Sequence, residues 1–289
     1  MTPLRQRMME DMTLRGFSAR TQQSYLAGVA HLARHYGKSP DQITEEELRR
    51  YFLWMTTEKH YARATVTIAL CAIKFFFEKT LGKSFTTLQL ARPMPERKLP
   101  VVLSRDEVKR ILGCVRIPLY RACLSTIYAC GLRLTEGSRL QVGDVDGQRL
   151  LLRVRGKGNK DRYVPLVEPT LRRLREFWKT HRSPVWLFPT ATRHGMRYSI
   201  AHDAGPVSRC ALQLAFRQAL KASGVNKRAS IHTLRHSYAT HLLEANVNLR
   251  IIQHNLGHDS PKTTAVYTHL TREVRDSLTE PLNRLVAEL

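Results

Sequence analysis

The sequence predicts a mainly α-helical protein with a small antiparallel β-sheet, divided into two domains. Residues 1–90 are helical in pattern throughout. Residues 91–102 follow as a basic, proline-rich stretch that no helix can cross. Residues 103–289 continue with helices but include two short apolar runs around a glycine-rich turn, the pattern of a β-hairpin. A length of 289 residues suits two domains and is enough to bury a core.

The first domain, residues 1–90, is expected to be a bundle of about four helices, since its connections are short. Ser18 and Thr44 stand where capping residues belong, and Glu47 completes a capping-box pattern with Thr44. Gly37 and Gly82 stand where left-handed residues end helices. The expected helices cover 18–37, 44–54 and 62–81, and the last carries a core-like apolar stripe.

The stretch at 91–102 is interpreted as an extended linker between the domains. It contains three prolines, and its basic residues Arg92, Arg97 and Lys98 suit a strap lying along a phosphate backbone. A plain exposed linker explains the same composition, so the pattern leaves both possibilities open.

The second domain, residues 103–289, begins at another capping box, formed by Ser104 and Glu107. Apolar residues at 150–154 and 163–166 predict two antiparallel strands joined by a basic turn at 155–162. The expected helices of this domain are 105–114, 118–130, 134–141, 168–182, 208–222, 232–245, 247–255 and 272–287.

The charge balance points to an anionic polymer. There are 47 Lys and Arg against 24 Asp and Glu, a formal net charge of +23. Such an excess repels itself unless a polyanion neutralises it, which favours a nucleic-acid partner over a merely solvated basic surface.

We expect a cytoplasmic protein associated with the nucleoid. The five cysteines form no C-x-x-C pair and are interpreted as small core residues in a reducing compartment. No signal-peptide pattern follows Met1. The most apolar stretch, 66–77, contains Lys74 and is too short to span a bilayer, so no membrane partner is expected.

Arg133 and Glu136 follow an apolar helix in the run Gly-Leu-Arg-Leu-Thr-Glu. An arginine in a turn between two helices can hold two phosphate oxygens with its guanidinium group. The alternative is an arginine that neutralises the carbonyl dipoles of a helix end.

Lys157 lies between two glycines at the expected hairpin tip, where the chain can approach a groove closely. A solvated turn lysine is the alternative. Lys160 and Arg162 lie nearby and are expected to make nonspecific contacts with a DNA backbone.

His232 and Arg235 start a helix three positions apart, so their side chains share one face. The helix N-terminus adds a partial positive charge that favours a bound phosphate. His236 and His241, farther along, are interpreted as packing or surface residues. The spacings His232/His236 and 254/258 resemble zinc-binding pairs but have no convincing third ligand, so no metal is expected.

His258 follows a glycine turn, and Tyr267 comes nine positions later near the end of a short expected helix. A lone tyrosine is usually a half-buried packing residue. The interpretation of Tyr267 as a nucleophile therefore depends on the other residues of the set.

Together these segments resemble the tyrosine recombinases, or phage integrase family, and in particular its bacterial Xer-like members. The matching motifs occur in the family's order and spacing: Tyr-Ala-Cys-Gly-Leu-Arg-Leu-Thr-Glu from residue 128, Gly-Lys-Gly-Asn-Lys-Asp-Arg from 156, His-Thr-Leu-Arg-His-Ser-Tyr-Ala-Thr-His from 232, and Leu-Gly-His with Tyr-Thr-His from 256 and 267. The resemblance extends from about residue 18 to the end. It implies a helical SAM-like core-binding domain and a mixed α/β catalytic domain.

The resemblance also implies a set of roles. Tyr267 attacks the scissile phosphorus and leaves a 3′-phosphotyrosyl bond, with His232 as the base. Arg133 and Arg235 balance the transition-state charge. The remaining expected roles are proton donation to the leaving 5′ oxygen by Lys157, a hydrogen bond to a nonbridging oxygen by His258, and orientation of these groups by Glu136.

Neither metal nor organic cofactor is implied. The partners are double-stranded DNA and three further copies, joined through the C-terminal segment 274–289 as an exchange helix that docks on a neighbour; a helix packed on its own domain is the alternative. Three other functions are considered: a monomeric type IB topoisomerase, a DNA-binding regulator with a relict site, and a metal-dependent nuclease.

Two departures from the family pattern are visible. Gly137 replaces a bulky apolar residue, and because glycine within a helix costs roughly 1 kcal/mol relative to alanine, a looser turn is expected there. The interval between Lys157 and His232 is also too short for the extra helix of integron integrases, which favours ordinary duplex targets.

Overall fold

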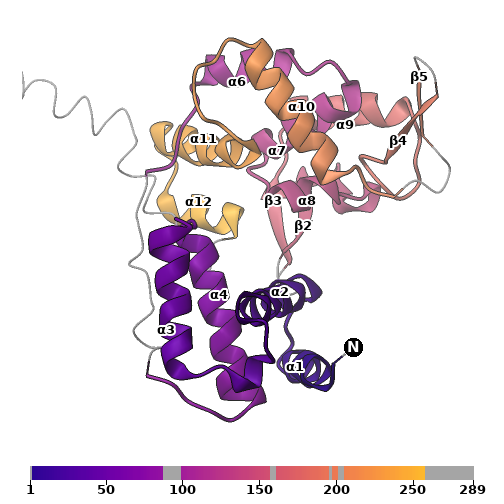
Figure 1. Ribbon diagram of the computed structural model, residues 1–289. Coiled ribbons are helices and arrows are strands. Elements are labelled where there is room, and N and C mark those ends of the chain that lie inside the picture. The colour runs from indigo at the N-terminus through magenta and orange to yellow at the C-terminus, as the bar shows by residue number, and fades with distance from the viewer. Residues whose placement is uncertain (1, 87–98, 157–160, 195–196, 201–204, 258–289) are drawn as a thin grey trace, which may run out of the picture. The chain divides into compact units, whose positions relative to one another are not determined.

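The structure, a computed structural model, describes residues 2–86, 99–156, 161–194, 197–200 and 205–257. The chain divides into two compact units, Met1–Lys98 and Leu99–Leu289. The division falls inside the stretch 91–102 that the sequence marks as a linker. The predicted class, mainly α-helical with a small antiparallel sheet, is confirmed (Figure 1).

Within residues 2–86, the described part of the first unit, all regular structure is helical. Its elements are α1 (Pro3–Leu14), α2 (Ala19–Tyr36), the short turn η1 (Pro40–Gln42), α3 (Glu45–Leu53) continued by the π-helical turn η2 (Trp54–Glu58), and α4 (Arg63–Phe75) continued by the π-helical turn η3 (Phe76–Thr80). Their apolar faces share one core, which includes Leu32, Leu48, Tyr51, Ile73 and Phe77.

The predicted caps set the ends of these helices. The Ser18 hydroxyl accepts a hydrogen bond from the backbone N–H of Thr21 at 3.3 Å at the start of α2. Thr44 and Glu47 form the reciprocal capping box at the start of α3. Gly37 ends α2 in the left-handed conformation. Local side-chain chemistry therefore fixes where α2 and α3 begin.

The second unit combines helices with two small antiparallel sheets. Its elements are α6 (Arg105–Gly113), α7 (Pro118–Ala129), α8 (Leu134–Ser138), η4 (Val142–Asp144), β1 (Val145–Asp146), β2 (Leu151–Arg155), β3 (Asp161–Pro165), α9 (Glu168–Lys179), β4 (Ala191–His194), β5 (Arg197–Ile200), α10 (Arg209–Ala222), α11 (Ile231–Glu244) and α12 (Leu249–Leu256). The expected helix at 272–287 lies outside the described residues.

The first sheet has the order β1-β2-β3, and Val154 of β2 is opposite Arg162 of β3. Burial alternates along both strands, so Leu152, Val154, Arg162 and Val164 all lie on the buried side. Strand periodicity thus places one arginine on the face that packs against the core.

Several details differ from the prediction, and three of them change the architecture locally. Helix α8 ends at Ser138 instead of continuing to 141, because the Leu140 carbonyl accepts from the Leu187 N–H and the chain there runs beside residues 185–187. The β4–β5 hairpin was not predicted. Leu150 has a positive φ of 54°, so β2 begins one residue later than expected.

Helix α11 packs on α7 and on α12, and α12 in turn contacts β3 (Figure 1). The first residues of the unit are hydrogen-bonded to α11, since the Leu103 N–H donates to the buried Ser237 hydroxyl at 2.9 Å. The Lys227 ammonium holds the preceding residue, donating to the Val102 carbonyl at 3.1 Å.

Candidate active site

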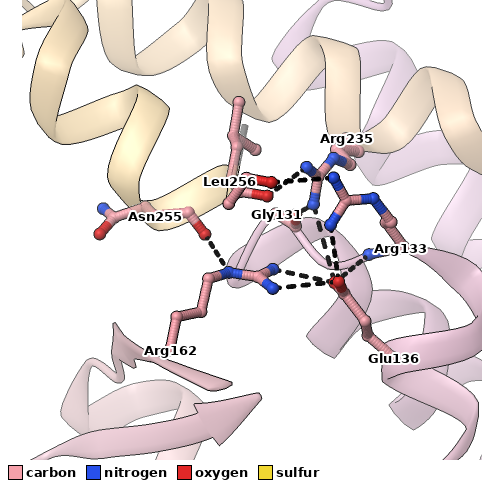
Figure 2. A network of polar contacts seen from close by, with 8 residues as sticks. Gly131, Arg133, Glu136, Arg162, Arg235, Asn255 and Leu256 are labelled. Carbon is pink, nitrogen blue, oxygen red and sulfur yellow. Dashed lines mark hydrogen bonds and ion pairs between the residues drawn. The ribbon is translucent and has the colours of Figure 1, made fainter. Parts of the chain in front are cut away.

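Three arginines converge on one buried carboxylate, that of Glu136 (Figure 2). Arg133 Nη1 lies 2.8 Å from Oε1, and the Arg133 backbone N–H donates to Oε2 at 2.8 Å. Arg162 Nη1 and Nη2 donate to Oε1 and Oε2 at 3.0 and 2.9 Å. Arg235 Nη1 stands farther away, 3.7 Å from Oε2. The site is thus a cluster of three positive charges around one negative charge.

The same three arginines also hold the end of α12. Arg162 Nε donates to the Asn255 carbonyl at 2.8 Å, Arg235 Nη2 to that of Leu256 at 2.5 Å, and Arg133 Nη2 to that of Gly257 at 3.1 Å. The last carbonyls of a helix have no partner within it and carry its partial negative charge. Three successive carbonyls are therefore each held by a different arginine.

A left-handed glycine allows this convergence. Gly131 has φ 59°, and a Cβ there would lie 2.4 Å from the ring of Tyr238. Its carbonyl accepts from Arg235 Nη1 at 2.6 Å. A side chain at this position would be strained in its backbone and would displace Tyr238, so the turn between α7 and α8 requires glycine.

The structure bears on both interpretations of Arg133. Its side chain is 37% exposed, the most open of the three arginines, so it remains within reach of a phosphate. It also neutralises a helix end, as the alternative had it, but the helix is α12 and not the preceding α7. The two interpretations are therefore compatible.

Arg162 differs from its expectation as a nonspecific DNA contact. Its side chain is buried, because strand alternation turns it to the same side as Val164. Its Nε and both of its Nη atoms donate to protein oxygens, those of Glu136 and Asn255. A guanidinium group used in this way is a structural partner of Glu136 and of the end of α12.

The charge cluster keeps Glu136 ionised. Burial by itself would raise the pKa of Glu136, but the hydrogen bonds from Arg162 and from the Arg133 N–H outweigh it and lower the pKa to about 2. A buried carboxylate of this kind depends on its partners, since removing one leaves an uncompensated charge.

His232 lies at the start of α11 on the same face as Arg235. Although its side chain is exposed, loss of hydration on its inner side lowers the pKa of His232, and the charges of Arg235 and Arg133 lower it further against the opposing effect of Glu136. The imidazole is therefore neutral at neutral pH, the form that can accept a proton.

The other histidines of α11 fit the packing interpretation. His241 is buried, and its Nδ1 lies 2.9 Å from the Tyr128 hydroxyl. His236 is partly buried. Among the described residues no group of three or more His, Cys, Asp or Glu side chains could hold a metal ion.

Several expected site residues lie outside the described part of the chain. These are Lys157, Lys160, His258 and Tyr267, together with the linker residues Arg92, Arg97 and Lys98. In the sequence, His258 directly follows Gly257, whose carbonyl Arg133 binds.

In the described segments, no helix has the length and apolar character needed to cross a membrane.

Two family profiles match this chain. Residues 101–273 match the phage integrase family, and residues 4–87 match the phage integrase N-terminal SAM-like domain. The chain belongs to the phage integrase family. The family resemblance drawn from the sequence motifs is thereby confirmed.

Relatives of this integrase-family chain align with most of its length. It is 44% identical to a putative integrase/recombinase (y4qK) of Sinorhizobium fredii, over 93% of this chain and 85% of that protein. It is 32% identical to the tyrosine recombinase XerC of Halalkalibacterium halodurans, over 78% of this chain and 77% of that protein.

Solved structures agree in fold. A crystal structure of the XerA recombinase matches with a TM-score of 0.52 at 28% identity, covering 96% of this chain and 97% of that one. A lambda integrase tetramer bound to a Holliday junction matches with a TM-score of 0.72 at 18% identity, covering 91% and 75%.

Proposed function

We propose that this protein is a site-specific DNA recombinase that cuts and rejoins strands through a 3′-phosphotyrosyl bond at Tyr267. One observation carries the proposal: Arg133 and Arg235 converge on Glu136 beside His232, in a chain of the phage integrase family. Two guanidinium groups near a neutral imidazole are the groups that phosphoryl transfer needs when no metal supplies the positive charge.

Strand cleavage exchanges one phosphate ester for another. A bond forms between the Tyr267 phenolic oxygen and phosphorus while the bond from phosphorus to the 5′ oxygen breaks. The phenolic proton passes to His232, and Lys157 gives a proton to the leaving 5′ oxygen. A phenol with a pKa near 10 needs such an acceptor at neutral pH.

The charges of the transition state are met by donors fixed in advance. Arg133 and Arg235 balance the negative charge on the phosphoryl oxygens, and His258 donates to a nonbridging oxygen. Glu136 orients the arginines without reacting. The phosphotyrosyl ester keeps the energy of the phosphodiester, so that a 5′ hydroxyl from another duplex restores a strand without ATP.

Double-stranded DNA is the proposed partner, and four copies on two sites form the working complex. The net charge of +23 supports a polyanionic substrate. The first unit would be the core-binding domain, residues 91–102 a basic strap on the DNA, and 274–289 the exchange helix. The lambda integrase that shares this fold is itself a tetramer on a Holliday junction. Association with the nucleoid would follow from such a substrate.

The test is a suicide duplex, nicked near its cleavage site so that the covalent adduct cannot reverse. The wild-type protein should trap the adduct, and Tyr267→Phe should trap none. Tyr163→Phe is the matched control, because Tyr163 is an exposed tyrosine of the same unit outside the site; it should trap adduct like the wild type.

The products distinguish the remaining functions. Recombined DNA supports the recombinase, whereas relaxed DNA without strand exchange would indicate a monomeric type IB topoisomerase. DNA binding with no adduct from the wild type would indicate a regulator with a relict site.

A further inference from the structure

We propose that Arg162 is a positioning residue for strand cleavage: it holds the Glu136 carboxylate and the last turn of α12, and so keeps Arg235 and Arg133 where a phosphate needs them. The inference rests on the proposed function. It assigns to Arg162 a part in the chemistry without any contact to DNA.

The first support is geometric. The guanidinium group of Arg162 spans two elements, giving both Nη atoms to Glu136 and its Nε to the Asn255 carbonyl. Its aliphatic part lies against the end of α12, since a Cβ added at Gly257 would be 3.1 Å from its Cδ. Arg162 therefore fixes the distance between the Glu136 carboxylate and α12, the helix that precedes His258 in the sequence.

The second support is the way the charges are shared. The Arg162 side chain donates to both oxygens of Glu136, and the Arg133 side chain donates to Oε1. Arg235 Nη1 stays 3.7 Å from Oε2, too far for a hydrogen bond, and donates to the Gly131 carbonyl while Nη2 donates to that of Leu256.

Loss of Arg162 would disturb this arrangement. When a buried carboxylate loses its bidentate partner, the free energy of the unpaired charge is strongly unfavourable. The carboxylate then attracts the nearest remaining cation. That cation is Arg235, already within 3.7 Å, and moving it onto Glu136 would break its bonds to the carbonyls of Gly131 and Leu256. Arg162 thus prevents Glu136 from withdrawing an arginine from the phosphate site.

The experiment compares DNA affinity with the cleavage rate of the bound complex. Full-length protein is saturated with suicide duplex, the first-order rate of adduct formation is measured, and affinity is followed across a salt series. Arg162→Gln should slow adduct formation about 100-fold, the effect of a misplacement near 1 Å. Its salt slope should equal that of the wild type, since no phosphate contact is lost.

Two further variants test the charge argument. Arg162→Lys keeps the positive charge but not the two-pronged geometry, so its rate should lie between those of the wild type and Arg162→Gln. The double variant Arg162→Gln with Glu136→Gln removes the orphaned carboxylate and should cleave faster than Arg162→Gln alone. A merely structural role would change the fraction of folded protein, and with it the amount of adduct, but would leave the first-order rate of the bound complex unchanged.

Arg153→Gln is the matched control. Arg153 lies in the neighbouring strand β2 and is also ion-paired, with Nη2 2.8 Å from Asp161 Oδ2, but it is exposed. Its cleavage rate should stay within about twofold of the wild type, as for most surface substitutions.

Three results would overturn the proposal. The first is an unchanged cleavage rate in Arg162→Gln, and the second is a salt slope reduced by about one, which marks a phosphate contact. The third is a double variant that cleaves no faster than Arg162→Gln alone.

If Arg162→Gln does not fold, Arg162→Lys alone decides the question. Slower cleavage at an unchanged salt slope supports the proposal, and cleavage at the wild-type rate overturns it. Absence of any adduct from the wild type would instead refute the proposed function.

Discussion

Arg162 and Glu136 form a buried bidentate ion pair. Arg162 Nη1 lies 3.0 Å from Glu136 Oε1, and Arg162 Nη2 lies 2.9 Å from Glu136 Oε2. Their side chains are 8% and 5% exposed. Exposed pairs such as Arg153 with Asp161 contribute little to stability because water screens them. The buried pair is different, since neither partner can return to water without unfolding, and it joins β3 to α8.

The ionisation of Glu136 should make its contribution to stability depend on pH. Its pKa is about 2 in the fold against an ordinary 4.5, so the ionised carboxylate stabilises the fold above pH 4.5 and this stabilisation is lost as the pH falls to 2. In urea unfolding, the stability difference between the wild type and Glu136→Gln should shrink by roughly 3 kcal/mol over that interval. A difference that does not vary with pH would contradict the burial and pairing of Glu136.

Substitution of Gly137 should reveal close packing where the sequence predicted a loose turn. A Cβ at Gly137 would lie 2.4 Å from Ile127 Cγ1, so α7 and α8 leave no room for a methyl group. Gly137→Ala gains about 1 kcal/mol of helix propensity, but the overpacking costs about 1–3 kcal/mol. We expect a net loss in the free energy of unfolding.

A companion variant separates packing from helix propensity. Ile127→Ala removes the opposing atoms, so Gly137→Ala should destabilise less in that background than in the wild type. If Gly137→Ala instead raises the unfolding midpoint in urea, the glycine serves no packing role.

Gly257 and Gly224 form a natural pair for testing the contact between α12 and Arg162. Both have positive φ, 61° and 69°, but only Gly257 has neighbours within 4 Å of an added Cβ, and these belong to Arg162. Gly224→Ala should cost about 1 kcal/mol from backbone strain. Gly257→Ala should cost more and should also slow adduct formation. Equal effects on stability, with normal cleavage, would show that the contact is unimportant.

Cleavage should depend on the neutral form of His232. Partial desolvation, with Arg235 and Arg133, lowers the pKa of His232 below its ordinary 6.5. Acid therefore inactivates the base, and the rate at subsaturating DNA should fall with a midpoint below pH 6.5. His232→Gln should abolish this acidic limb. A midpoint above 6.5, or a limb that persists in the variant, would assign the titration to another group.

Chelation should leave cleavage unchanged. Arginine guanidinium groups lie at this site, so the proposed mechanism requires no divalent ion. Single-turnover adduct formation should be equal in EDTA and in Mg²⁺. Loss of cleavage in EDTA with recovery on adding Mg²⁺ would support the metal-dependent nuclease.

The elements with local signals could be predicted from the sequence. Caps at Ser18, Thr44 and Ser104 act within one helical turn, so the helix starts they mark were predicted within one residue. The β4–β5 hairpin carries only half of such a signal: in its segment, Ala-Thr-Arg-His-Gly-Met-Arg-Tyr-Ser-Ile, apolar residues alternate with polar ones after the glycine but not before it. Pairing between strands decides such segments, and a single sequence does not record it.

The site shows the same contrast. His232 and Arg235 lie three apart on one helix, so their shared face could be inferred directly. The contacts of Arg162 join it to residues 26 and 93 positions away, beyond any local pattern. One signal was present nevertheless: Arg162 is in phase with Val164 and Leu166 along the strand, and both are buried. Alternation predicts a buried arginine, and a buried arginine requires an acidic partner.

The tie between Leu103 and Ser237 has a mechanical consequence. Tension applied to the chain through the segment preceding Leu99 would reach the second unit at Val102 and Leu103, where the first hydrogen bonds to bear it run to Lys227 and to the side of α11. That helix carries His232 and Arg235. A pull on the connecting chain would thus act, through Ser237, on the helix that carries the proposed base His232.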